Sequence, residues 1–174
     1  MSFVNNNRGR TPQNRLYLCD ASPSARRETP FVRGMTVHDL PAIMSIEQAS
    51  FHNPWSMTSF QSELQDNEFA HYHCLVCRGE VIGYMGYWAI FDEAHVTNVA
   101  IGPQHRGRGW GQYLLGNVML HCLQTGITRM TLEVRVSNEA AQHMYAKMGF
   151  AAVGVRPGYY TDNREDAVIM WATL

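Results

Sequence analysis

HRGRGWGQYLL, residues 105–115, places three glycines at alternate positions directly before an apolar run with helical spacing. Glycine has no Cβ, so it lets backbone N–H groups turn inward and lets a ligand approach the chain closely. The first turn of the following helix adds unpaired N–H groups and the positive end of its dipole. The segment therefore predicts a cradle for a pyrophosphate group, although the same residues could also form a loop that binds no ligand.

Two common nucleotide-binding motifs do not fit this segment. Gln112 stands three residues after Gly109, where the dinucleotide motif needs a glycine, and the lysine of the P-loop is absent. Arg106 and Arg108 could pair with further phosphate oxygens or could be solvated loop charges. These departures disfavour both a mononucleotide and a dinucleotide fold.

Hydrophobic periodicity around the glycine segment predicts a mixed α/β domain with one central sheet and no internal repeat. Asp39, Ser56 and Ser137 are candidate helix caps, and Pro41 suits a first helical turn. The expected order is β-α-α-β-β-β-α-β-α-β-β. The strands are expected at about 31–35, 71–77, 81–88, 94–101, 129–136, 150–156 and 166–173, and the helices at about 40–51, after Ser56, at 110–124 and at 138–148.

Length and composition indicate one soluble domain. The chain has 174 residues, and no apolar run approaches the roughly 18 to 20 residues of a membrane span. No secretory signal is evident, so a cytoplasmic location is expected. Residues 1–28, rich in Asn, Arg, Ser and Pro, are predicted to be a disordered basic tail before a domain at 29–174, and Met35 could be an alternative start.

Charge is distributed unevenly along the chain. Residues 1–34 carry six arginines against two acidic residues, whereas the remainder has 8 basic and 13 acidic residues. The acidic domain favours a positively charged partner and disfavours a nucleic-acid surface, although such an imbalance often reflects only solubility. Docking of the basic tail on RNA is the one nucleic-acid contact left open.

The cysteines predict no metal site. Cys74 and Cys77 form a C-x-x-C pair within a predicted strand, where residues three apart point to opposite faces, and no second pair exists. We expect buried or half-buried structural thiols. Cys122 lies on the inward stripe of a predicted helix, which argues against a nucleophilic role.

Several segments together resemble a known family. RGRGWG (106–111) is similar to the R-x-x-G-x-G pyrophosphate motif of the GCN5-related N-acetyltransferases (GNAT), with Arg106, Gly109 and Gly111 in its fixed places. LEVRVSNEAAQHMYAKMGF (132–150) and GYYTDNREDAVIM (158–170) resemble the bacterial ribosomal-protein-alanine N-acetyltransferases of that family. IEQASFHNPWS and FDEAHVTNVAI fit the same group, so the resemblance spans residues 31–172.

The resemblance implies a single α/β domain with a mixed, mostly antiparallel sheet and helices on both faces. It implies transfer of acetyl from acetyl-CoA to a protein N-terminal amine in a ternary complex, without a metal. The pantetheine arm would pair with the backbone of Val99, Ala100 and Ile101. The other cofactor contacts implied are Arg106, Gly107, Arg108, Gly109, Trp110, Gly111, Gln112 and Asn138.

The resemblance also places a general base at Glu133, and the chemistry agrees with that role. An α-amino group has a pKa near 8, so at neutral pH it must lose a proton before it can attack a thioester. Glu133 is flanked by apolar Leu132 and Val134, where partial burial would raise its basicity. The alternative is an ion pair with Arg135 on the same strand face.

The resemblance places the family's general acid at Tyr145, whose hydroxyl would protonate the departing thiolate. Asn138 and Tyr145 are seven residues apart on one predicted helix, so both face the same groove. A tyrosine buried in the core is the alternative. A backbone N–H of Val99 or a neighbour could stabilise the carbonyl oxygen.

The acceptor is less defined by the sequence. The resemblance suggests that Trp55, Asp92, Glu93, Tyr159 and Tyr160 frame a peptide slot. Acidic side chains there would suit a basic residue beside the N-terminus, but Asp92 and Glu93 could form an exposed turn and Trp55 could fill the core. Two alternatives to a ribosomal protein's terminal alanine stay open: another acceptor, such as a lysine side chain, another terminus or a small amine, and a non-catalytic acyl-CoA-binding module.

Overall fold

The structure, a computed structural model, describes residues 29–174. The tail predicted at residues 1–28 lies outside this part of the chain. Within it, no helix is long and apolar enough to cross a membrane.

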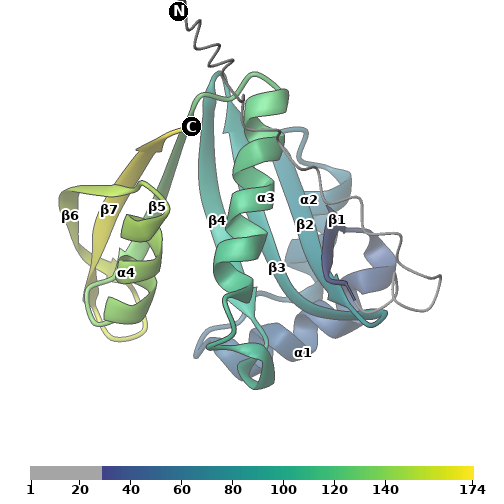
Figure 1. Cartoon of the computed structure of the whole chain (residues 1–174). Helices are drawn as coiled ribbons and strands as arrows, with labels where there is room; N and C mark the ends of the chain where they lie inside the picture. Colours follow the sequence, from purple (N-terminus) through teal and green to yellow (C-terminus); the bar gives the residue numbers. More distant parts are fainter. Residues whose placement is uncertain (1–28) are drawn as a thin grey trace, which may run out of the picture.

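A seven-stranded sheet forms the centre of the molecule, with the strand order β1-β2-β3-β4-β5-β7-β6 (Figure 1). β4 and β5 are parallel, and every other neighbouring pair is antiparallel. The mixed, mostly antiparallel sheet is therefore confirmed. The strands are β1 (Phe31–Gly34), β2 (Ala70–Cys77), β3 (Glu80–Ile90), β4 (Glu93–Ile101), β5 (Arg129–Arg135), β6 (Ala151–Tyr160) and β7 (Glu165–Thr173).

Helices cover both faces of the sheet, as expected (Figure 1). α1 (Leu40–Ser50) and α2 (Met57–Gln65) bury Ile43 and Phe60 in an apolar cluster with Tyr84 and Ala100. α3 (Trp110–Gln124) and α4 (Glu139–Lys147) bury their apolar stripes in a separate cluster. We call these two sides the α1/α2 face and the α3/α4 face. The 3-10 turns η2 (Val37–Asp39) and η3 (Pro103–His105) complete the elements.

Of the three predicted helix caps, the structure confirms Ser56. Ser56 caps α2, since its hydroxyl accepts the Ser59 N–H at 3.0 Å. Ser137 does not cap α4: the Asn138 side chain accepts the Ala141 N–H at 3.2 Å. Asn is as good an N-cap as Ser, so the cap falls one residue later than predicted, and the Ser137 N–H donates to a Glu165 carboxylate at 2.8 Å.

Asp39 also differs from its predicted role as the cap of α1. Its backbone is already helical, and its side chain accepts no hydrogen bond from α1. The carboxylate turns back to accept the Thr36 N–H at 2.8 Å and pairs with Arg33 at 2.7 Å. The chain therefore enters α1 through η2, which begins after Thr36.

The strands β4 and β5 separate soon after they start. They pair only between residues 93–95 of β4 and 129–131 of β5 (Figure 1). β4 also carries a bulge against β3, because Val96 pairs with Tyr87 whereas Asn98 pairs with the preceding residue, Gly86. Beyond His95, β4 therefore has a free edge that faces an opening in the sheet.

The predicted structural thiols are confirmed at three positions. Cys74 and Cys122 are buried and Cys77 is half-buried, all as free cysteines. Cys19 lies outside the described residues. No group of three or more potential metal ligands occurs within residues 29–174.

Candidate functional site

A cavity of about 630 Å³ lies where β4 and β5 separate. It is bounded by the end of α1 and the loop after it, by β4 and β5, by the start of α4 and by the β6–β7 hairpin. The lining residues include Glu47, Ser50, Trp55, Asn98, Val99, Glu133, Arg135, Asn138, Tyr145, Tyr159, Tyr160, Asp162 and Glu165.

The cavity brings together many of the residues expected from the sequence. Val99, Glu133, Asn138, Tyr145, Trp55, Tyr159 and Tyr160 all line it, although 105 residues separate the first of these in the chain from the last. Trp55 is half-buried, and its ring also packs against Phe60 at a centroid distance of 5.5 Å. It therefore contributes to the cavity wall and to the α1/α2 cluster.

Glu133 projects from β5 toward the cavity. Leu132 and Val134, its neighbours, are buried in the α3/α4 cluster, so strand alternation places Glu133 on the opposite side. Its side chain keeps 26% of its surface exposed, and its Oε1 accepts a hydrogen bond from Arg156 at 3.3 Å. The ion pair with Arg135 that the sequence left open is replaced by this contact.

Tyr145 belongs to both the cavity and the core. It is 5% exposed, and its ring packs against Phe150 at a centroid distance of 5.7 Å. Burial, with a smaller contribution from Tyr160, raises the pKa of its hydroxyl. The phenol is therefore protonated at neutral pH and available as a donor at the cavity wall. Asn138, two turns earlier, lines the same cavity while capping α4.

The glycine segment directly follows β4 and η3 and leads into α3. Gly107 and Gly109 have φ values of +73° and +80°, and a Cβ at either would meet no atom within 4 Å. These two glycines are thus needed for the backbone path, and the space beside them is open. Gly111 is different, because it lies inside α3 and a Cβ there would stand 2.9 Å from Met144 Sδ. It permits close packing of α3 on α4.

Arg106 braces the glycine segment against the rest of the molecule. Its Nε donates to the Ile101 carbonyl at 2.9 Å, and its Nη2 donates to Ser50 Oγ at 2.7 Å. The side chain therefore ties the loop to the end of β4 and to α1. Arg108 is exposed. Trp110 and Gln112 begin α3, while Ala100 and Ile101 continue β4 beyond the cavity.

Asp92 and Glu93 are not brought to the cavity. They lie at the start of β4, where that strand still pairs with β5, at the end away from the opening. Asp92 accepts from the Thr128 hydroxyl at 2.9 Å, and Glu93 pairs with Arg129 at 2.9 Å. These carboxylates hold the turn after β3 against the start of β5.

Other acidic residues, which the sequence analysis did not select, occupy the cavity wall. Glu47 is only 1% exposed, and its carboxylate accepts the Trp55 N–H at 2.8 Å and the Tyr84 hydroxyl. Burial raises its pKa, against the effect of these two hydrogen bonds. A glutamate directly after Ile46 in an apolar helical stripe was the available signal, because carboxylates are rarely buried without a partner.

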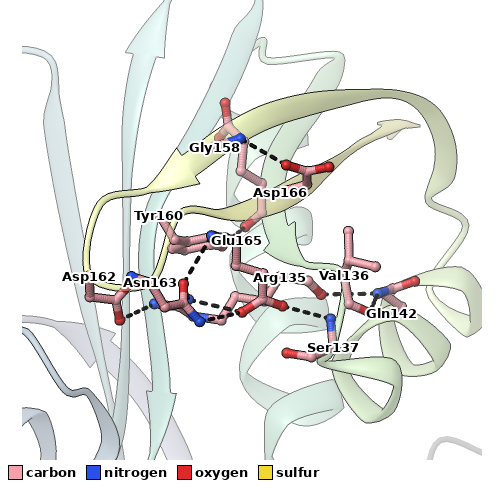
Figure 2. Close-up of polar contacts among 11 residues, drawn as sticks. Arg135, Val136, Ser137, Gln142, Gly158, Tyr160, Asp162, Asn163, Glu165 and Asp166 are labelled. Carbon is pink, nitrogen blue, oxygen red and sulfur yellow. Dashed lines mark hydrogen bonds and ion pairs between the residues drawn. The ribbon is translucent and has the colours of Figure 1, made fainter.

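The turn of the β6–β7 hairpin is fixed by Arg135 (Figure 2). Its guanidinium donates to Asp162 at 2.7 Å and to Glu165 and Asn163 at 3.0 Å each. It also lies 3.8 Å from the centre of the Tyr160 ring. Arg135 therefore holds Tyr160 and the turn against the cavity.

Comparison with known proteins agrees with the fold and the motifs. Residues 40–150 match the profile of the Acetyltransferase (GNAT) family. The chain belongs to this family, and it is an N-acetyltransferase that uses acetyl-CoA.

Individual members of the family are similar to this chain over most of its length. A Bacillus subtilis (strain 168) protein, named as a candidate ribosomal protein bS18-alanine N-acetyltransferase, is 43% identical over 143 residues, which cover 82% of this chain and 95% of that protein. The ribosomal protein bS18-alanine N-acetyltransferase of Escherichia coli (strain K12) is 34% identical and covers 80% of this chain and 94% of its own length. The crystal structure of the ribosomal-protein-S18-alanine N-acetyltransferase from Escherichia coli has a TM-score of 0.77 at 33% identity, over 83% of this chain and 94% of that one.

Proposed function

We propose that this chain acetylates the terminal α-amino group of a ribosomal protein that begins with alanine, and that it does so in the cytoplasm. The relatives named for that reaction align over nearly their whole length. The observation that carries the proposal is the cavity at the separation of β4 and β5, which joins Glu133 and Tyr145 in one wall.

The residues present fit acetyl-CoA. Gly107 and Gly109 leave open space beside the start of α3, where N–H groups and the helix dipole favour a pyrophosphate. Residues 99–101 lie beyond the part of β4 that pairs with β5, so backbone groups that point to this open edge can bind the amides of the pantetheine arm. Bound acetyl-CoA supplies a thioester carbonyl as the target of the amine.

Glu133 is proposed as the base that takes a proton from the acceptor amine. Its position on the cavity side of β5 and its partial exposure allow contact with a substrate directly or through one water. Val99, which lines the cavity from β4, is proposed to donate its N–H to the carbonyl oxygen.

Tyr145 is proposed as the proton donor to the departing sulfur. Burial keeps its hydroxyl protonated at neutral pH, and none of the described residues forms a hydrogen bond with that hydroxyl. Its proton is therefore available to a group that enters the cavity. Asn138 is proposed as a cofactor contact at the start of the same helix.

The charge of the cavity supports a basic acceptor. Glu47, Glu133, Asp162 and Glu165 line it together with Arg135. Even with Arg156, which pairs with Glu133, these four carboxylates outnumber the arginines, which favours an α-ammonium group and a basic second residue. Trp55, Tyr159 and Tyr160 are proposed to contact the peptide, whereas Asp92 and Glu93 are not placed to do so.

Release of free thiol from acetyl-CoA in the presence of short peptides tests this proposal. The peptides begin Ala-Arg or Ala-Glu, and a third carries an internal lysine and a blocked terminus. Faster turnover with Ala-Arg is expected. Preference for the lysine peptide would assign a different acceptor, and binding of acetyl-CoA with no transfer to any peptide would contradict the acetyltransferase role.

A further inference from the structure

A second, more open groove adjoins the cavity and runs along α2. It has a volume of about 480 Å³, and Asn53 and Trp55 line both spaces. From these two residues the lining follows α2 as far as Ser62 and Glu63, and we call this space the α2 groove. The reaction proposed above does not use it. A peptide whose terminus occupies the cavity can extend into it past Trp55.

The lining of the α2 groove is polar and follows one face of the helix. Ser56, Ser59 and Ser62 recur at intervals of three residues, and Glu63 stands seven residues after Ser56. Hydroxyl and carboxylate groups are costly to bury against an apolar surface. The groove therefore suits an extended polar segment rather than an apolar partner.

Glu63 is held in place by neutral groups. Its Oε2 accepts hydrogen bonds from Trp88 Nε1 at 2.7 Å and from the Tyr72 hydroxyl at 3.2 Å, and its Oε1 accepts one from the Asn67 amide at 3.2 Å. None of the ion pairs within residues 29–174 involves this carboxylate. Glu63 is half-buried, so a fixed carboxylate without a cationic partner borders the groove.

The chain around the α2 groove carries acidic charge without strongly basic groups. Residues 34–77 contain no lysine or arginine, but they contain five acidic residues. Three of these five, Glu63, Asp66 and Glu68, belong to α2 or to the turn that follows it. A local field of one sign attracts a cation and repels a carboxylate. The occupant that fits is therefore a basic side chain of the acceptor.

The length of the α2 groove indicates which residue of a peptide would reach Glu63. The seven residues from Ser56 to Glu63 span about 10 Å along the helix axis. An extended peptide covers that distance in about three residues. With the second residue of the acceptor beside Trp55, the fourth or fifth residue lies beside Glu63.

We infer that Glu63 binds a basic side chain at the fourth or fifth residue of the acceptor, and that the α2 groove is a specificity subsite. The inference rests on the proposed function and adds a residue that determines specificity. Glu63 lies outside the cavity that holds Glu133 and Tyr145, so its contact is the same before and during acyl transfer. Such a contact lowers KM and leaves kcat almost unchanged.

The test moves one arginine along the acceptor peptide. Every peptide begins Ala-Arg and continues with glutamine, and a second arginine stands in turn at position three, four, five or six. Thiol release is measured for the wild type, for Glu63→Gln, which keeps the size of the side chain and removes its charge, and for Glu68→Gln as the matched control. Glu68 is exposed, belongs to the same acidic segment and lines neither the cavity nor the α2 groove.

In the wild type and in Glu68→Gln, the second arginine should raise kcat/KM by about 3- to 10-fold at position four or five, through KM. This gain lies between the value of an exposed ion pair and that of a hydrogen bond to a charged group. In Glu63→Gln the ratio between the arginine peptide and the glutamine peptide should fall to about one. Added salt should reduce the gain in the wild type.

No gain at position four or five, an equal gain at all four positions, or a gain that persists in Glu63→Gln would overturn the inference and leave the proposed function in place. An equal loss in Glu63→Gln with the arginine and glutamine peptides would also overturn it, because Glu63 would then have a structural role. No turnover of any peptide by the wild type would overturn both proposals. If Glu63→Gln does not fold, glutamate replaces the second arginine in the peptide, and an equal KM of the wild type for the two peptides contradicts the subsite.

Discussion

At the scale of single residues, Glu133 owes its place to a local pattern. The alternation of β5 buries Leu132 and Val134 on one face and turns Glu133 to the other, where β4 has moved away. The sequence could predict this orientation because alternation needs no knowledge of the tertiary structure. Its partner Arg156 was not predictable, because that residue arrives from β6, across β7 in the sheet.

Glu133→Gln keeps the shape of the side chain and removes its basicity. We expect kcat with an Ala-Arg peptide to fall by about 10²–10⁴-fold, most visibly below pH 8, because a general base contributes on that order. The Kd for acetyl-CoA should change little. Steady-state kinetics between pH 6 and 9 are the measurement, with Glu80→Gln at the exposed start of β3 as control. Unchanged kinetics would remove the base assignment.

Tyr145→Phe tests the proton donor without opening the core. The ring and its contact with Phe150 are retained, so the Tm and the Kd for acetyl-CoA should match the wild type within error. The rate of thiol release should fall by about 10²–10⁴-fold, the usual contribution of a general acid. A variant that works at the full rate would leave Tyr145 as a core residue.

The acidic residues show where prediction from local pattern ends. Asp92 directly precedes β4 and Glu93 begins it, yet both lie at the end of the strand that pairs with β5, where they hold Arg129. Glu47 and Asp162 reach the cavity from α1 and from the β6–β7 turn. Which loops meet there depends on where β4 and β5 part, and no local pattern specifies that point.

At the scale of elements, the glycine segment combines two requirements that look alike in the sequence. Gly107 and Gly109 allow the positive φ angles that the backbone adopts there. Gly111 instead allows α3 to pack closely against Met144 of α4. The motif predicted where the helix begins, and α3 does start at Trp110. It could not predict the second role, because Met144 belongs to an element that lies later in the chain.

Substitutions at Gly109 separate the backbone requirement from the space for a ligand. Gly109→Ala is expected to destabilise the fold by about 1–2 kcal/mol through its positive φ, with Gly34→Ala as a control in open space without that constraint. Gly109→Trp is expected to abolish binding of acetyl-CoA by filling the cradle. Urea unfolding and calorimetric titration measure the two effects, and retained affinity in Gly109→Trp would contradict the cradle.

At the scale of the whole molecule, the order of elements was predictable because each hydrophobic period is long and clearly bounded. The ends of the elements were less predictable: α4 begins after Asn138 rather than Ser137, since the Asn138 side chain supplies the capping oxygen. Both faces of the sheet are buried. The α3/α4 face also holds a group of histidines between β2 and α3. His73 lies between Tyr87 and His121, with ring centroids 5.9 and 5.1 Å away.

These histidines predict a loss of stability in acid. Burial, with the nearby His121 and His71, lowers the pKa of His73 to about 4, and burial also lowers that of His71. The unfolded chain, with a histidine pKa near 6.5, binds more protons in this window, so stability is full above pH 6.5 and falls toward pH 4. Urea unfolding at pH 7 and 4.5 should differ by about 1–3 kcal/mol, and His73→Leu should reduce the difference. An equal pH dependence in both proteins would contradict this origin.

The central claim is that cofactor and acceptor meet where β4 and β5 separate. A conjugate that joins CoA through an acetyl bridge to the α-amino group of an Ala-Arg peptide tests it most directly, by its Kd in calorimetric titration. If both halves occupy the cavity together, the conjugate should bind at least about 100-fold more tightly than CoA alone. Glu133→Gln, which keeps the cavity's shape, should retain most of that gain. A conjugate that binds no better than CoA would show that the peptide does not enter beside the cofactor, and would contradict the account.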